Sequence, residues 1–189
     1  TFDARIINNR GDAVWHRIKF SVVFDENDNA VQFVGNLTDI DKEKKEKNRL
    51  IAQAETDQRT GFLNKLSTAL KINEIIKTDN EEGAFFIFDI DDFKKLNDTY
   101  GHRVGDIFLK ELTGKLSLSF RTTDVLGRVG GEEFVLYLSG VGDNRHYLEE
   151  KAVQIQSICN SIRLEVAPEE EISCSIGISR FPFDGKTYT

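Results

Sequence analysis

The feature that most constrains the fold is a single apolar run, AFFIFDI, at residues 84–90. In an extended strand its apolar side chains fall on both faces, as they do in the central strand of a covered sheet. The run ends in acid, because Asp89 belongs to it and Asp91 and Asp92 follow at once. It therefore predicts a buried central strand with carboxylates at its end.

The segments around this run predict an α+β domain over residues 57–189. Three stretches have apolar residues at helical spacing: 63–76, 107–120 and 147–164. Three shorter stretches are apolar or alternating, as strands are: 125–129, 134–138 and 172–178. The order predicts a mostly antiparallel sheet with helices on one face.

The N-terminal part of the chain has a different pattern. Three extended stretches separated by polar turns predict antiparallel strands: 4–7, 14–24 and 30–37. A hairpin of this size cannot bury both of its faces alone, so residues 1–40 are expected to be the end of a β-rich domain. Residues 41–56 begin with DKEKKEK and lack Gly and Pro, which predicts a helical linker.

Charge and composition exclude several classes of partner. The chain has 25 Lys plus Arg against 32 Asp plus Glu, a formal net charge of −7, which argues against binding nucleic acid. No apolar run approaches the roughly 20 residues of a membrane-spanning helix, and no signal-peptide pattern is present. Cys159 and Cys174 form no CxxC pair and are expected to be reduced thiols. We therefore expect a cytoplasmic protein, with no membrane segment in the residues given.

A second acidic pair lies at the tip of a predicted hairpin. Glu132 and Glu133 follow Gly130 and Gly131, and glycine lets a ligand approach the backbone closely. If this hairpin lies beside the strand that ends at Asp89, three carboxylates converge and repel one another unless a cation neutralises them. Oxygen-only ligands suit Mg²⁺ or Mn²⁺. The alternative is that these acids are solvated turn residues.

Five segments in order resemble the GGDEF-domain diguanylate cyclases. Residues 128–134, RVGGEEF, are similar to the family signature in its GGEEF form. DQRTGFLNK at 57–65 resembles the family's opening DxLTGLxNR, with Arg59 in place of the usual Leu. The remaining three are DIDDFKKLND at 89–98, GHRVGD at 101–106 and SIG at 175–177.

The resemblance implies a palm-like nucleotide cyclase fold and a set of metal ligands. The ion would be Mg²⁺ or Mn²⁺, bound by Asp89, the carbonyl of Ile90, Glu132 and Glu133. One of the glutamates would take the proton from the attacking 3′-hydroxyl, and we favour Glu132. The family's sheet is followed by a helix that helps to hold the triphosphate. The sequence ends at Thr189, before such a segment, so the domain is expected to be incomplete at its C-terminus.

The resemblance also implies contacts to phosphates and to the base. Lys94 would neutralise charge on phosphate, and backbone amides near Asp92 and Phe93 would hold the terminal phosphates. Asn97 and Asp106 would read guanine, whose adjacent N1–H and N2–H₂ donors suit one carboxylate and are absent from adenine. The alternatives are that Asn97 is a turn residue and that Asp106 caps a helix.

Three further assignments rest on the same resemblance. His102 would lie beside the substrate or only cap a helix. Arg121 and Asp124 are similar to the family's inhibitory product site, although a surface ion pair is the alternative. Residues 1–40 resemble the closing strands of a PAS sensor domain.

These resemblances imply an enzyme that condenses two GTP into cyclic di-GMP and pyrophosphate under the control of an N-terminal sensor. One site holds one GTP, so the catalytic unit would be a homodimer. Cyclic di-GMP would be both product and feedback inhibitor. The alternative is a catalytically inactive GGDEF module that binds GTP or cyclic di-GMP as a receptor.

Overall fold

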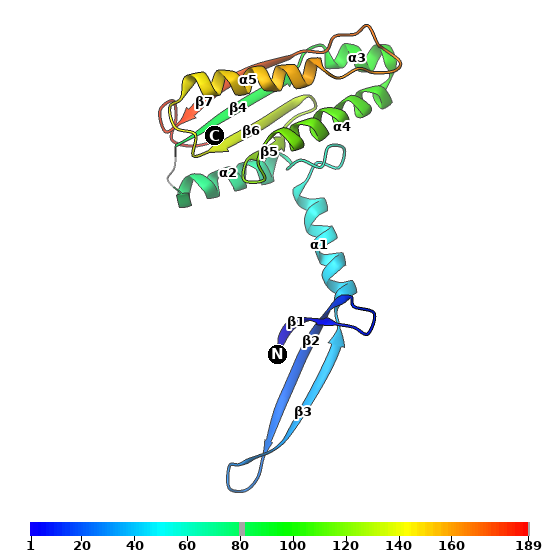
Figure 1. Ribbon diagram of the computed structural model, residues 1–189, viewed down its shortest axis with the longest axis vertical. Coiled ribbons are helices and arrows are strands. Elements are labelled where there is room, and N and C mark those ends of the chain that lie inside the picture. The colour runs from blue at the N-terminus through cyan, green and yellow to red at the C-terminus, as the bar shows by residue number, and fades with distance from the viewer. Residues whose placement is uncertain (80–81, 189) are drawn as a thin grey trace. The chain divides into compact units, whose positions relative to one another are not determined.

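The computed structural model describes residues 1–79 and 82–188, so three positions of the expected 57–189 domain lie outside the described residues (Figure 1). The chain divides into two compact units, Thr1–Ala54 and Glu55–Thr189. Among the described residues, no helix combines the length and the apolar character needed to cross a bilayer.

The first unit is a three-stranded antiparallel sheet followed by a helix. The sheet has the order β1-β2-β3, and its elements are β1 (Phe2–Ile7), β2 (Ala13–Phe24), β3 (Ala30–Asp39) and α1 (Asp41–Glu55). Every residue of β3 is exposed, as expected for strands that cannot cover both faces. The first turn of α1 is tied to the sheet, because the Asp41 carboxylate accepts a hydrogen bond from the Trp15 amide at 3.4 Å.

The second unit is an antiparallel sheet with the strand order β5-β6-β4-β7 (Figure 1). Its strands are β4 (Gly83–Ile90), β5 (Val125–Arg128), β6 (Glu133–Ser139) and β7 (Cys174–Phe181). Its helices are α2 (Lys65–Asp79), α3 (Phe93–Tyr100), α4 (His102–Ser119) and α5 (Arg145–Asn160). β4 pairs with β6 on one side and with β7 on the other, which confirms the predicted central strand.

Helices cover both faces of this sheet, so the expectation of helices on one face is wrong. Phe86 and Phe88 of β4 belong to a core that includes buried residues of α4 and α5. Phe85, which directly precedes Phe86 in the strand, belongs to a second core with Ile72 of α2. Alternate side chains of a strand point to opposite faces, so an apolar run on both faces requires cover on both.

One helix was not predicted, and another begins earlier than predicted. α3 buries only Phe93 and Leu96, too few apolar positions for a periodic signal. α4 begins at His102 rather than at residue 107, and Gly101 separates the two helices with a φ of 88°. Glycine adopts this positive φ without the steric cost that a Cβ atom would impose.

Phe134 anchors the hairpin tip to the core. The side chain is fully buried and stacks on Phe88 with ring centroids 5.4 Å apart. It also meets the Phe62 ring edge-on at 6.2 Å. Since Phe134 directly follows Glu133 in the sequence, this packing fixes where that glutamate begins its strand.

We expect Phe134→Ala to lower the free energy of unfolding by about 3–5 kcal/mol, because it leaves a cavity between two aromatic rings. Urea unfolding followed by circular dichroism measures the change. The matched control is Phe183→Ala, whose side chain is 49% exposed and should cost less than about 1 kcal/mol. Equal losses for the two variants would contradict the anchoring role.

Candidate functional site

The acidic residues singled out from the sequence meet where β4 ends and β6 begins. Asp89 and Glu133 are paired across the antiparallel ladder. One step further, the Ile90 amide donates a hydrogen bond to the Glu132 carbonyl oxygen at 3.2 Å. The hairpin tip therefore lies beside the end of the central strand.

The electrostatics show that these carboxylates repel one another. Burial raises the pKa of Asp89, and the negative charges of Glu133 and Asp91 raise it further. Burial likewise raises the pKa of Glu132, as do Asp89 and Glu133, while Lys94 lowers it. The ionised acids destabilise one another in the absence of a neighbouring positive charge.

The donor chemistry of this cluster fits a hard divalent cation. Across residues 1–79 and 82–188, no three His, Cys, Asp or Glu side chains already form a group that could hold a metal ion. The available donors are the carboxylates of Asp89, Glu132 and Glu133 together with the backbone carbonyl of Ile90. All are oxygen ligands of the kind that Mg²⁺ and Mn²⁺ prefer. A cation would relieve the repulsion that adds to the effect of burial on the pKa values of Asp89 and Glu132.

Gly130 leaves room for the Glu133 side chain at the hairpin tip. The Val129 amide bonds to the Glu133 carbonyl oxygen at 2.9 Å, which closes the turn. A Cβ atom on Gly130 would come within 2.2 Å of Oε2 of Glu133. Any larger residue at this position would therefore displace the glutamate carboxylate.

A buried arginine connects the hairpin tip to the segment before α2. The Arg128 guanidinium pairs with Oδ1 of Asp57 at 2.9 Å and donates to the carbonyl oxygen of Gly131 at 2.6 Å. Oδ1 of Asp57 also accepts hydrogen bonds from the amide and hydroxyl of Thr60. Burial raises the Asp57 pKa, but the bonds from Thr60 and Arg128 outweigh it and leave the pKa below its usual value. Sequence reasoning assigned no role to this pair.

The turn between β4 and α3 exposes backbone donors. Asp92 has a left-handed φ of 55°, and no side chain caps α3. The first amides of a helix have no partner within the helix and favour anions. This geometry suits the phosphate contacts predicted for amides near Asp92 and Phe93. Lys94 is exposed in the first turn of the same helix.

Strand β7 and the residue before it hold this turn in place through Asp91. The carboxylate accepts hydrogen bonds from the hydroxyls of Ser173 at 2.5 Å and Ser175 at 2.7 Å. The Asp91 amide donates to the Ser173 carbonyl oxygen at 3.0 Å. These contacts link residues 82 and 84 positions apart, which local sequence patterns cannot indicate.

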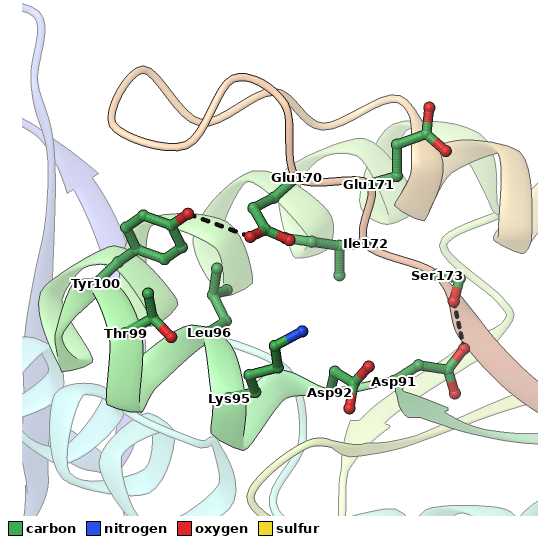
Figure 2. A pocket seen from close by; sticks show the side chains of 10 residues that line it. All are labelled: Asp91, Asp92, Lys95, Leu96, Thr99, Tyr100, Glu170, Glu171, Ile172 and Ser173. Atoms are coloured by element: carbon green, nitrogen blue, oxygen red, sulfur yellow. Dashed lines mark hydrogen bonds between the residues drawn. The ribbon is translucent and has the colours of Figure 1, made fainter.

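A small cavity is lined in part by Asp91 and Asp92 of this turn (Figure 2). The Lys95 side chain points into it, and the Tyr100 hydroxyl donates to Glu170 at 3.2 Å across one end. Its volume is about 70 Å³, far below the roughly 300–1,000 Å³ of ligand pockets. This cavity is too small to be the nucleotide site.

The predicted base-reading residues come from α3 and α4. A Cβ atom on Gly105 would lie 2.1 Å from Oδ1 of Asn97, so the Asn97 amide occupies the space that this glycine leaves. Asp106 follows Gly105 inside α4, whose N-cap is Gly101. The alternatives of a turn residue and a helix cap are therefore wrong for Asn97 and Asp106. His102 is the first residue of α4 and is exposed.

Arg59, the residue that departs from the family pattern, reaches the same place. Its Nη1 lies 3.2 Å from Oδ1 of Asp106. Sequence reasoning noted the departure and assigned it no role.

The predicted inhibitory pair lies after α4. The Asp124 carboxylate accepts a hydrogen bond from the Arg121 amide at 2.8 Å and so closes a turn. Burial raises the Asp124 pKa despite this bond and the nearby positive charges of Arg121 and Lys151. Both Arg121 and Asp124 line a wide groove that also includes Phe62 and Phe120.

Comparisons with known proteins find several matches to this chain. Residues 54–189 match the family described as "Diguanylate cyclase, GGDEF domain". The chain is 34% identical over 141 residues to the probable diguanylate cyclase DgcC of Escherichia coli strain K12, a match that covers 70% of this chain and 36% of the relative. It is 32% identical over 163 residues to the cyclic di-GMP phosphodiesterase PdeR of the same strain, covering 85% and 24%.

A solved structure shows the same fold. The crystal structure of a sensory box/GGDEF family protein from Caulobacter crescentus CB15 matches with a TM-score of 0.63 and 28% identity. The match covers 70% of this chain and 87% of that one. The chain spans well under half the length of the two curated relatives named above.

Replacing Glu133 by Gln should lower the pKa of both Asp89 and Glu132. Both values are raised in part by the negative charge of Glu133, which the amide removes with little change of shape. Carboxyl ¹³C NMR titration measures the two values, and Glu149→Gln on the exposed side of α5 is the matched control. Unchanged values in the Glu133 variant would mean that these acids lie too far apart to share a cation.

Proposed function

Since the chain belongs to the GGDEF domain family of diguanylate cyclases, we propose that it condenses two molecules of GTP into cyclic di-GMP and pyrophosphate. The observation that supports this most directly is the pairing of Asp89 with Glu133 at the end of the β4–β6 ladder, with Glu132 beside them. All three acids that the chemistry needs are present and close enough to repel one another.

In each of the two condensation steps of the proposed reaction, the 3′-hydroxyl oxygen of one nucleotide bonds to the α-phosphorus of the other as the bond to pyrophosphate breaks, so that two pyrophosphates are released. Glu132 takes the proton of that hydroxyl, and its raised pKa makes it a stronger base than an ordinary glutamate. Asp89, Glu133 and the carbonyl of Ile90 would bind Mg²⁺ or Mn²⁺ together with Glu132. The ion supplies positive charge that offsets the carboxylates and the phosphate oxygens.

The remaining site residues bind and orient the nucleotide. Lys94 and the amides at the start of α3, near Asp92 and Phe93, hold the phosphates away from the carboxylates. Asn97 and Asp106 read the guanine edge. His102 begins α4 beside this pair and would contact the bound nucleotide.

The wider organisation follows from the same proposal. Residues 57–189 form the catalytic domain, residues 41–56 the helical linker and residues 1–40 the end of a PAS-like sensor. One site holds one GTP, so two catalytic domains face each other in a homodimer. Both substrates are GTP, which is consistent with a cytoplasmic location.

A second candidate function is that of a catalytically inactive receptor, which binds GTP or cyclic di-GMP and carries out no condensation. It is supported by the similarity to PdeR, which is named a cyclic di-GMP phosphodiesterase. The complete set of acids at the end of β4 favours the cyclase.

The full-length protein should convert GTP to cyclic di-GMP in the presence of Mg²⁺. Glu133→Gln should reduce product formation by about a hundredfold or more, because it removes a charge that stabilises the reacting groups. Chromatography of the products over time measures both rates, with Glu149→Gln as the control. Tight binding of GTP without any product would favour the receptor instead.

Feedback inhibition should depend on Arg121. Arg121→Ala removes a cationic donor to the phosphate or guanine of cyclic di-GMP, and the inhibition constant should rise about tenfold or more. The initial rate without added product should not change, since Arg121 follows α4 outside the acid cluster. Arg145→Ala, at an exposed arginine of α5, should leave inhibition intact. Unchanged inhibition in the Arg121 variant would show that this segment binds no product.

A further inference from the structure

An ion pair joins Arg59 to Asp106 across 47 positions of sequence. The side chains are 61% and 47% exposed. Pairs this exposed contribute about 0–1 kcal/mol to stability. A contribution to stability therefore does not explain why Arg59 contacts Asp106, the residue proposed to read the base.

The backbone holds Arg59 in a closed turn that faces this carboxylate. The Gly61 amide bonds to the Asp57 carbonyl oxygen at 2.8 Å, and the Asp57 amide bonds to the Phe62 carbonyl oxygen at 2.8 Å. Gly61 has a φ of 75°, a conformation that glycine adopts readily. Asp57 is in turn held by the buried Arg128. The turn is thus fixed at its base, and Arg59 extends from it to Asp106.

The two charged groups together match the hydrogen-bonding edge of guanine. N1–H and N2–H₂ are donors that suit the Asp106 carboxylate. O6 and N7, which lie next to them on the base, are acceptors that a guanidinium binds with two hydrogen bonds. We propose that Arg59 determines specificity by binding O6 and N7 of the guanine whose N1–H and N2–H₂ contact Asp106. This inference rests on the proposed role of Asp106.

The pair also gives each of the two charged groups a partner when no base is bound. Without a nucleotide, Arg59 and Asp106 neutralise each other at 3.2 Å. When guanine enters, each side chain exchanges this exposed contact for bonds to the base. Adenine would place its 6-amino donor against the guanidinium and would be rejected there as well as at Asp106. A leucine at position 59 could make none of these bonds.

The test compares the binding of GDP with that of two analogues, each of which lacks one hydrogen-bonding group of the base. Diphosphates are used because they cannot undergo the condensation reaction. Calorimetry with the full-length protein measures binding of GDP, 7-deaza-GDP, which lacks the N7 acceptor, and IDP, which lacks the 2-amino group. Arg59→Leu should weaken GDP binding about tenfold or more. It should also abolish the preference for GDP over 7-deaza-GDP, while the preference for GDP over IDP persists. In Asp106→Ala the preference over IDP should disappear instead.

Arg145→Leu is the matched control, and its affinities should equal those of the unaltered protein. Thermal unfolding of each variant by circular dichroism shows that the fold is retained. Equal or tighter GDP binding by Arg59→Leu would overturn the inference, because Arg59 would then be a surface partner or an obstruction. If the unaltered protein binds no guanine nucleotide, or if Asp106→Ala keeps its preference for GDP over IDP, the proposed base reading itself fails.

Discussion

The ion pair between the buried Arg128 and the half-buried Asp57 is the interaction on which the geometry of the site depends. The Arg128 side chain is only 6% exposed, and removing one partner of such a pair costs about 3–5 kcal/mol because the other charge is left uncompensated. One arm of the guanidinium holds the carbonyl of Gly131 at the acidic hairpin tip, and the other holds the turn that presents Arg59. A single side chain therefore sets the positions of two segments with different chemical roles.

The site places repelling carboxylates at the end of the most apolar strand of the chain. Asp89 follows Phe86 and Phe88, which are buried in the core, and Glu133 precedes the buried Phe134. The aromatic packing opposes the tendency of the charges to separate the two strands. Proteins often tolerate local destabilisation at functional positions when the packing of the surrounding core holds those positions in place.

The sequence predicted the parts of this arrangement that depend on short-range pattern. The apolar run at 84–90 indicated the central strand, and the acids at its end indicated the site. The helix α3 was not predicted because its two buried residues produce no periodic signal in the sequence. The bonds from Ser173 and Ser175 to Asp91 and the pair between Arg59 and Asp106 join residues far apart in the chain. Such contacts follow from the tertiary fold, and no local propensity encodes them.

The register between β4 and β6 limits where residues can be inserted into this chain or deleted from it. Asp89 and Glu133 share a face only because seven consecutive pairs, from Gly83 with Ser139 to Asp89 with Glu133, keep their register. Inserting one residue into either strand would turn every later side chain to the opposite face, moving a carboxylate into the aromatic core. Gains or losses of residues should therefore be confined to the connecting loops, such as the stretch between α5 and β7.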